Sequence, residues 1–130
     1  MARILLLDDD PDTLETLTSL LVGWGHDVTS VSNGRDGLER HPENFDAILL
    51  DLGMPVLDGW SFKRHLDALS VRVPVILLSG EPDLAGAASE LGAFGCLPKP
   101  IRPDAINLLL VRALKFGGQD PLSPSRPHGP

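Results

Sequence analysis

Along this chain, short runs of apolar residues alternate with amphipathic segments. Three of the runs are almost continuous and cover residues 4–7, 47–50 and 75–78. Unbroken apolar runs of this length are typical of strands in a parallel sheet that is covered on both faces. Weaker strand patterns at residues 26–31 and 93–97 complete a set of five predicted strands.

Amphipathic segments between and after these strands predict five helices. Four are expected at residues 11–23, 33–40, 81–91 and 103–116, and another begins after Asp58 and runs through Leu69. Asp10 and Asp58 stand where helix-capping residues belong, and Pro11 suits a first helical position. In the helix after Asp58, we expect a buried stripe of Phe62, Leu66 and Leu69 and a solvent side of Lys63, Arg64 and Asp67.

Strands that alternate with helices predict an α/β fold. We expect an open, doubly wound, five-stranded parallel sheet with right-handed crossovers, and such sheets bind ligands at the carboxyl ends of their strands. The length fits one domain, which we place at residues 1–117. Residues 118–130 are rich in proline and poor in large apolar side chains. A disordered tail or the start of a linker is therefore expected there.

The composition narrows the classes of function. Of 130 residues, 42% are hydrophobic, and 18 acidic residues against 11 basic ones give a net charge of −7. This charge argues against binding nucleic acid by bulk electrostatics. A single cysteine, Cys96, excludes an intramolecular disulfide, and we assign no ligand role to the four scattered histidines. The first residues lack a signal-peptide core or a membrane segment, so a cytoplasmic protein without membrane insertion is expected.

Polar residues follow the predicted strands at their carboxyl ends. Asp8 and Asp9 follow the first strand, and Asp51 follows the third. Ser79 follows the fourth strand, and Lys99 lies close to the end of the fifth. Because parallel strands end at the same edge of a sheet, these five side chains are expected to meet.

The residue types at this edge suit phosphoryl transfer. Three carboxylates in one cleft repel one another unless a cation offsets their charge, and Mg²⁺ prefers carboxylate oxygens while leaving room for phosphate oxygens. A carboxylate can act as the nucleophile and form an acyl phosphate, while an ammonium and a hydroxyl stabilise the phosphoryl oxygens. Asp51 fits the nucleophile, Lys99 the ammonium and Ser79 the hydroxyl.

Four segments, taken together, resemble the response-regulator receiver domains of two-component signalling. They are ILLLDDDP at residues 4–11, DLGMPVLDG at 51–59, PVILLSG at 74–80 and Lys99-Pro100, and the resemblance spans roughly residues 3–116. It implies a flavodoxin-like fold with strand order 2-1-3-4-5. It also implies a cis peptide bond between Lys99 and Pro100.

The resemblance implies a function as well. Asp51 would accept a phosphoryl group from a histidine kinase or a phosphotransfer protein in a Mg²⁺-dependent reaction. Asp9, Asp51 and the backbone carbonyl of Gly53 would ligate the ion directly, and Asp8 would act partly through water. The chain would be a phosphorelay switch that catalyses only its own phosphorylation and dephosphorylation, rather than an enzyme with an external substrate.

The implied output is a change of protein partner. A downstream protein would bind the face formed by the fourth helix, the fifth strand and the fifth helix. The resemblance is also compatible with a homodimer. Cys96 departs from the family pattern, because receiver domains often carry Tyr or Phe three residues before the lysine. We interpret it as a small buried hydrophobe rather than a redox sensor. Phe94 is expected to point the same way along the strand, so Ser79, Phe94 and Cys96 are the candidate readout residues.

Two alternatives remain at this point. A degenerate receiver domain would keep the fold as a phosphorylation-independent interaction or dimerisation module, although the site residues are all present. A Mg²⁺-dependent phosphohydrolase on a related scaffold usually has a second Asp two residues after the nucleophile as a general acid. Gly53 stands there in this chain and has no proton to donate, so hydrolysis of external phosphoesters is not expected.

Overall fold

The structure, a computed structural model, describes residues 2–54, 56–80 and 84–116. The strands are β1 (Arg3–Leu7), β2 (Asp27–Val31), β3 (Ala47–Asp51), β4 (Val75–Ser79) and β5 (Gly95–Pro98). The helices are α1 (Pro11–Gly23), α2 (Gly34–Glu39), α3 (Gly59–Ala68), α4 (Leu84–Leu91) and α5 (Pro103–Phe116). A short 3-10 helix, η1 (Pro42–Asn44), precedes β3.

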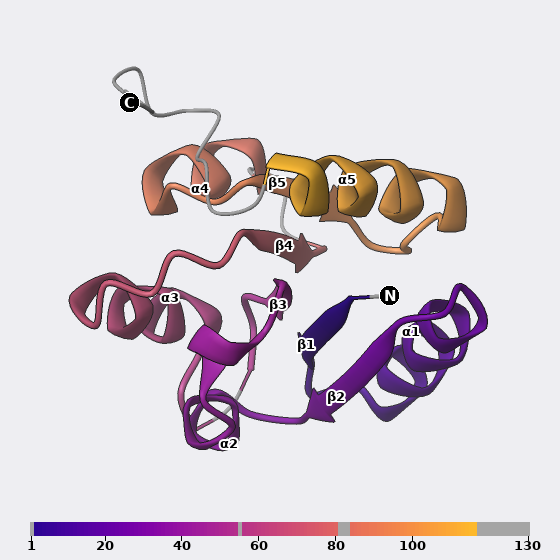
Figure 1. Cartoon of the computed structure of the whole chain (residues 1–130). Helices are drawn as coiled ribbons and strands as arrows, with labels where there is room; N and C mark the ends of the chain where they lie inside the picture. The colour runs from indigo at the N-terminus through magenta and orange to yellow at the C-terminus, as the bar shows by residue number, and fades with distance from the viewer. Residues whose placement is uncertain (1, 55, 81–83, 117–130) are drawn as a thin grey trace.

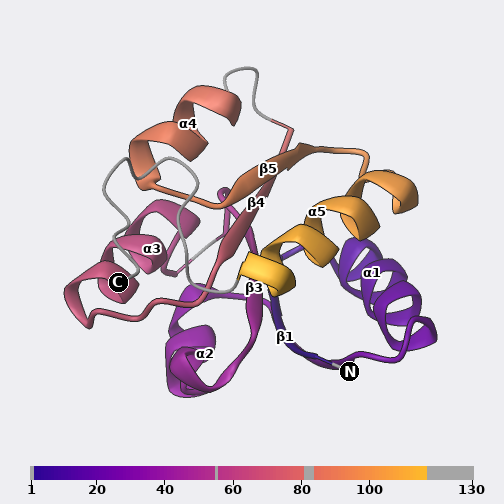
Figure 2. The same cartoon turned by 45° about the horizontal axis from the view of Figure 1, so that its top comes forward.

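The five strands of the described chain form one parallel sheet in the order β2-β1-β3-β4-β5. Figures 1 and 2 show α1 and α5 on one face of this sheet and α2, α3 and α4 on the other. The predicted fold class and the strand order implied by the resemblance are both confirmed.

Two apolar cores fill the space between the sheet and its two helical layers. On β1, Leu5 and Leu7 pack in the core under α3 and α4, whereas Ile4 and Leu6 pack in the core under α1 and α5. β3 and β4 are buried at every position. These strands form unbroken apolar runs because both of their faces are covered.

Side-chain caps begin the first three helices. Asp10, Asn33 and Asp58 each accept a hydrogen bond from a backbone N–H two or three residues later. Each cap satisfies an N–H of the first turn that has no partner within the helix. The Asn33 cap, together with the burial of Gly34 and Gly37, accounts for a helix at α2 despite two residues of low helix propensity.

Two predictions on α3 are wrong. Leu69, expected in the core, is 68% exposed, because α3 ends at Ala68 and the chain already turns at Leu69. Lys63, expected on the solvent side, is buried, and its Nζ lies 2.6 Å from Oδ1 of Asp67. A lysine can bury its aliphatic stem while its ammonium reaches a carboxylate at the surface, and a hydrophobicity pattern does not reveal this.

The expected common direction of Phe94 and Cys96 is also wrong. Phe94 packs against the core under α1 and α5, whereas Cys96 packs against the core under α3 and α4. β5 begins at Gly95, later than predicted, so Phe94 lies before the strand. The alternation of side chains holds only within a strand, and it therefore does not relate these two residues.

Several predictions fall outside the described residues. The predicted helix at residues 81–91 is observed as α4 from Leu84, and residues 81–83 are not described. The tail predicted at residues 118–130 is likewise not described. Over the part of the chain that is described, no helix has the length and apolar character needed to cross a membrane.

Candidate functional site

The sheet brings the five predicted site residues to one edge. Asp51 is the last residue of β3 and pairs in register with Leu78, so Ser79 follows one position later at the end of β4. Ser79 pairs with Pro98, and Lys99 follows directly after β5. Asp8 and Asp9 leave the end of β1, which is the neighbour of β3.

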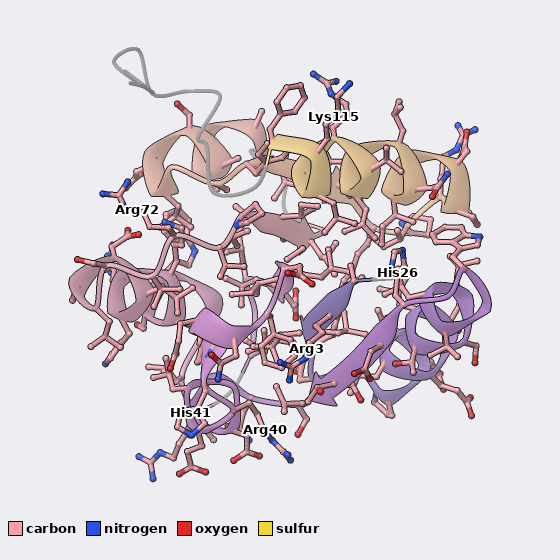
Figure 3. All side chains as sticks on the ribbon, viewed as in Figure 1. Arg3, His26, Arg40, His41, Arg72 and Lys115 are labelled. Atoms are coloured by element: carbon pink, nitrogen blue, oxygen red, sulfur yellow. The ribbon has the colours of Figure 1, made fainter. Side chains whose placement is uncertain are left out.

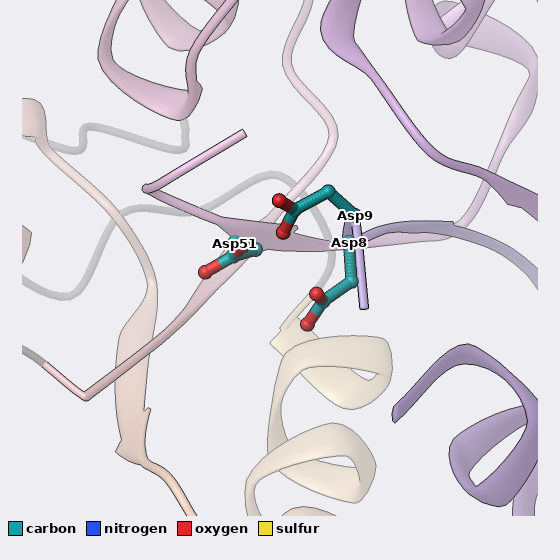
Figure 4. Close-up of side chains that lie close together, drawn as sticks. All are labelled: Asp8, Asp9 and Asp51. Carbon is teal, nitrogen blue, oxygen red and sulfur yellow. The ribbon is translucent and has the colours of Figure 1, made fainter. Parts of the chain in front are cut away.

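Three carboxylates form a cluster at this edge. One oxygen each from Asp8, Asp9 and Asp51 lies within 4.8 Å of the others. Asp8 is fully buried, Asp51 is 5% exposed and Asp9 lies open to solvent. Figure 4 shows the three side chains converging from the ends of two neighbouring strands. The two buried carboxylates cannot rely on water to screen their charges.

The Asp8 side chain is held from two sides. The backbone N–H of Asp10 donates a hydrogen bond to its Oδ1 at 2.9 Å, and the ammonium of Lys99 lies 2.9 Å from its Oδ2. Both oxygens are therefore engaged by groups of the chain itself.

The environment of Asp51 disfavours its charged form. Burial raises the pKa of Asp51 to about 6, and the negative charge of Asp8 adds to this effect. The Lys99 ammonium, 3.5 Å from Oδ1, and a hydrogen bond from the N–H of Gly53 act in the opposite direction. Burial and the charge of Asp8 together outweigh these two groups, so the protonated form of Asp51 is favoured relative to an exposed carboxyl group.

Lys99 is fixed by its backbone as well as by its side chain. Its N–H donates to the carbonyl of Ser79 at 2.9 Å, and the Lys99–Pro100 peptide bond is cis. Burial disfavours the charge of the ammonium, but the carboxylates of Asp8 and Asp51 outweigh burial and raise the pKa of Lys99. Lys99 is thus a permanent cation at neutral pH, aimed at the acidic cluster.

Ser79 completes the polar edge of the sheet. It is 3% exposed, and it lies between the strand that carries Asp51 and the strand that leads to Lys99. Its burial distinguishes it from an ordinary serine of a surface turn.

The donor set fits a hard divalent cation. Carboxylate oxygens are the ligands that Mg²⁺ prefers in proteins. A cation among Asp8, Asp9 and Asp51 would offset the repulsion by Asp8, which adds to the effect of burial on the pKa of Asp51. The cluster carries three carboxylates against the single ammonium of Lys99. The residues present therefore fit the metal that the resemblance implies.

A cavity of about 510 Å³ lies beside the cluster, between the start of α1 and the segment after β5. Asp10, Asp12 and Thr13 contribute polar groups to its wall, and Lys99 and Ile101 line it from the other side. Lys99, whose side chain is 26% exposed, therefore borders a hollow on this side of the site.

His26 and His41 lie on separate parts of the fold. Figure 3 shows His26 and His41 on opposite sides of the molecule. Nδ1 of His26 accepts a hydrogen bond from the N–H of Ala2, and Nδ1 of His41 lies 3.6 Å from Glu43. Their roles in the structure are local.

The close backbone contacts of Gly34 and Gly59 were not predicted from the sequence, which suggested only a weakened helix at Gly34 and a turn with a helix cap at Asp58-Gly59. A Cβ on Gly59 would meet the carbonyl oxygen of Asp51, and a Cβ on Gly34 would meet the carbonyl oxygen of Leu57. Each glycine directly follows a capping residue, Asn33 or Asp58, at a first helical position. A glycine placed directly after a cap, where most residues fit, is a signal that could have pointed to a close approach of two backbones.

A comparison with protein families agrees with this geometry. The family model of the response regulator receiver domain matches residues 4–111. The match runs from β1 into α5 and contains every residue of the candidate site.

Curated relatives are transcriptional regulatory proteins. The chain is 39% identical over 102 residues to the transcriptional regulatory protein CpxR homolog of Haemophilus influenzae, a match that covers 77% of this chain and 44% of that protein. It is 34% identical over 114 residues to the transcriptional regulatory protein ZraR of Escherichia coli, covering 85% of this chain and 26% of that protein. The chain thus spans less than half the length of these relatives.

Two solved structures of similar proteins share the fold over almost all of their length. The chemotaxis response regulator CheY4 of Vibrio cholerae superposes with a TM-score of 0.80 at 28% identity, covering 88% of this chain and 99% of that one. The receiver domain of the Francisella response regulator 1452 superposes with a TM-score of 0.83 at 26% identity, covering 89% and 98%.

Proposed function

The chain belongs to the response regulator receiver domain family, and on this premise we propose that it is a phosphoacceptor switch with Asp51 as the acceptor. A histidine kinase or a phosphotransfer protein would supply the phosphoryl group. The observation that carries the proposal is the convergence of three carboxylates within 4.8 Å, with the Lys99 ammonium 3.5 Å from the candidate nucleophile. Switches of this kind bias a conformational equilibrium that the protein already has.

The chemical step follows from the positions of these groups. An oxygen of Asp51 forms a bond to phosphorus while the bond between phosphorus and the histidine nitrogen of the donor breaks, and the imidazole keeps the electron pair. The product is an acyl phosphate on Asp51. The Lys99 ammonium stabilises charge on one phosphoryl oxygen, and the Ser79 hydroxyl donates a hydrogen bond to another.

Asp9, Asp51 and the Gly53 carbonyl would hold the Mg²⁺ ion, with Asp8 acting through water. When bound, the ion supplies positive charge that neutralises phosphoryl oxygens during transfer. The raised pKa of Asp51 supports this assignment, because a nucleophilic carboxylate must be ionised and a neighbouring cation favours ionisation.

Incubation with acetyl phosphate and Mg²⁺ tests the proposal. We expect the intact protein to gain one phosphoryl group, detected by mass spectrometry, and Asp51→Asn to gain none. Asp104→Asn is a matched control, because Asp104 is an exposed carboxylate in the first turn of α5 and should not affect the adduct. Chelation of Mg²⁺ should also prevent the adduct.

The other outcomes favour the two alternatives. A folded protein that forms no adduct under these conditions supports a degenerate receiver domain that acts as a phosphorylation-independent module. Multiple turnover of the phosphodonor without a stable adduct supports a phosphohydrolase. The presence of Asp8, Asp9, Asp51, Ser79 and Lys99 at one edge favours the switch over both.

The readout surface is the second part of this proposal. We place it on α4, β5 and α5, because β5 is the edge strand of the sheet and α4 packs beside it. A downstream protein would bind this face in one state of Asp51. Hydrogen exchange over residues 80–97, with and without beryllium fluoride as a phosphoryl mimic, tests this placement, and equal protection in both states contradicts it.

A further inference from the structure

We infer that Gly34 and Gly59 are positioning residues for the backbone that follows Asp51. This segment, called the acceptor loop here, comprises residues 52–54 and 56–58 and carries the Gly53 carbonyl. The two glycines fix it by close backbone contacts at its two ends. The inference rests on the proposed function, because it assigns these contacts to the metal site around Asp51.

Gly59 allows the start of α3 to lie in close contact with the backbone of Asp51, the proposed phosphoacceptor. Its N–H donates a hydrogen bond to the carbonyl of Leu52 at 3.2 Å. A Cβ at this position would lie 2.5 Å from the carbonyl oxygen of Asp51 and 2.7 Å from Cα of Leu52. No side chain fits there unless α3 or the end of β3 moves.

Gly34 makes the corresponding contact at the other end of the acceptor loop. Its N–H donates a hydrogen bond to the carbonyl of Leu57 at 3.2 Å, although the two residues lie on different parts of the chain. A Cβ on Gly34 would collide with that carbonyl oxygen and would lie 3.0 Å from Cβ of Leu57. The start of α2 thus holds the loop just before the Asp58 cap.

Burial of loop side chains adds to these two contacts. Leu52 is 2% exposed and Met54 is 4% exposed, and both belong to the core under α3 and α4. The loop is therefore anchored on both sides of Gly53, whose carbonyl is a proposed metal ligand. Residues that orient the ligands of a metal typically change its affinity by about 10- to 100-fold when they are altered.

Gly37 provides a matched control on the same helix as Gly34. A Cβ on Gly37 would collide with Cδ2 of Leu7 and lie 3.0 Å from Cε1 of Phe62. These obstacles are side chains of the core rather than the backbone of the acceptor loop. An alanine at any of the three positions should lower stability, but only the variants at Gly34 and Gly59 should move the metal ligands.

The experiment compares Gly34→Ala, Gly59→Ala and Gly37→Ala by amide NMR titration with Mg²⁺ at a temperature where each is folded. We expect the dissociation constant to rise about tenfold or more for Gly59→Ala and Gly34→Ala, and to stay at the parent value for Gly37→Ala. The inference is overturned if Mg²⁺ affinity is unchanged in Gly34→Ala and Gly59→Ala, or if Mg²⁺ binding is weakened equally in all three variants.

A second variant covers the case in which an alanine variant does not fold. Insertion of one glycine after Val56 keeps Gly34 and Gly59 unchanged. It lengthens the acceptor loop by one residue, so the contacts at its two ends hold the loop less firmly. It should weaken Mg²⁺ binding as the alanine variants do, whereas parent-like affinity contradicts the inference.

A metal-free measurement separates this inference from the proposed function. Without Mg²⁺, amide hydrogen exchange at residues 52–54 should be about tenfold faster in Gly34→Ala and Gly59→Ala than in Gly37→Ala, because only the first two variants release the loop. If the parent neither binds Mg²⁺ nor accepts phosphate, the proposed function fails, and this exchange still tests the loop contacts. Equal exchange in all three variants overturns the positioning role.

Discussion

The ammonium of Lys99 and the carboxylate of Asp8 lie 2.9 Å apart, and Asp8 is fully buried. The distance from Lys99 to Asp51 is longer, at 3.5 Å. In the absence of a bound phosphoryl group, Lys99 therefore serves mainly to neutralise Asp8. Phosphorylation of Asp51 would present a new set of oxygens to the same ammonium, so the Lys99–Asp8 pair is the contact that must loosen.

Replacement of Lys99 by methionine should destabilise the fold. The change leaves the buried carboxylates of Asp8 and Asp51 without their cation, and removal of one partner of a buried ion pair costs up to about 3–5 kcal/mol. Because the Lys99 side chain is 26% exposed, we expect a loss of about 1–3 kcal/mol at pH 8. The loss should shrink toward pH 5 as Asp51, whose pKa is raised to about 6, takes up a proton.

Urea unfolding of Lys99→Met at several pH values measures this effect. Lys115→Met is the control, because Lys115 is exposed on α5 and contacts only the ring of Phe116 among the interactions described. A loss of stability that does not depend on pH would mean that the packing of the Lys99 side chain, and not its charge, supports the fold.

Ionisation of Asp51 should lower stability. Its pKa is raised from 3.8 to about 6, so the protonated form favours the folded state, and this stability is present below about pH 4 and lost as the pH rises through about 6. Asp51→Asn cannot ionise. It should match the parent near pH 4 and exceed its unfolding free energy by on the order of 2 kcal/mol at pH 8. Parallel stability curves for the two proteins between these pH values would contradict this prediction.

The same pKa sets the pH dependence of metal binding. A Mg²⁺ ion held by Asp51 requires the ionised carboxylate, so binding competes with one proton below about pH 6. The dissociation constant should be nearly constant above this pH and should rise by about tenfold per pH unit below it. Amide NMR titrations with Mg²⁺ between about pH 5 and 8 measure this slope, and a dissociation constant that is flat down to pH 5 contradicts this prediction.

The sequence was sufficient to predict the order of the strands and helices along the chain and the residues that meet at the carboxyl ends of the strands. Continuous apolar runs identify strands covered on both faces, and the polar residues after those runs must meet at one edge, as Asp8, Asp51 and Lys99 do. The distances within the cluster were not predictable. Whether Lys99 lies closer to Asp8 or to Asp51 depends on the exact path of the chain after β5, which no local pattern records.

The errors have a common physical origin in contacts between distant segments. Lys63 on α3 is buried by the segments that pack around this helix. Helical periodicity does not show which segments those are, so it could not predict the burial of Lys63. Phe94 packs against the other core because β5 begins at Gly95, two residues later than predicted, so Phe94 lies before the strand. Gly34 and Gly59 have their roles through backbone contacts with Leu57 and Asp51 that only the folded chain creates.

Cys96 should react slowly with thiol reagents. Burial raises the pKa of its thiol, which lowers the fraction of thiolate at neutral pH, and the side chain is only partly open to solvent. Alkylation by iodoacetamide at about pH 7.5 should be about tenfold or more slower in the folded protein than in urea. Equal rates in the two states would remove the interpretation of Cys96 as a packed hydrophobe and would favour a redox-sensitive thiol.

Ser70 occupies a position that suits glycine better than serine. It follows the C-terminal cap of α3 with φ of 58°, in the left-handed region. The N–H of Val71 donates to the carbonyl of Leu66 at 2.9 Å and the N–H of Ser70 to that of Asp67 at 3.1 Å, which is the hydrogen-bond pattern of a Schellman motif. A residue with a Cβ in this conformation costs about 1 kcal/mol relative to glycine.

Ser70→Gly should therefore raise the unfolding free energy by about 0.5–1 kcal/mol, partly offset by the greater freedom of glycine in the unfolded chain. Ser19→Gly is the matched control, because Ser19 is exposed within α1 and glycine there should lower stability by about 0.5 kcal/mol. Urea denaturation of both variants measures the two effects. Ser70 lines a hollow together with Phe45 and Asp46, which precede β3, whereas Asp51 is the last residue of that strand. Acetyl phosphate labelling should therefore be the same in Ser70→Gly as in the parent. A decrease in stability for Ser70→Gly would show that its hydroxyl contributes more than the strain of its backbone.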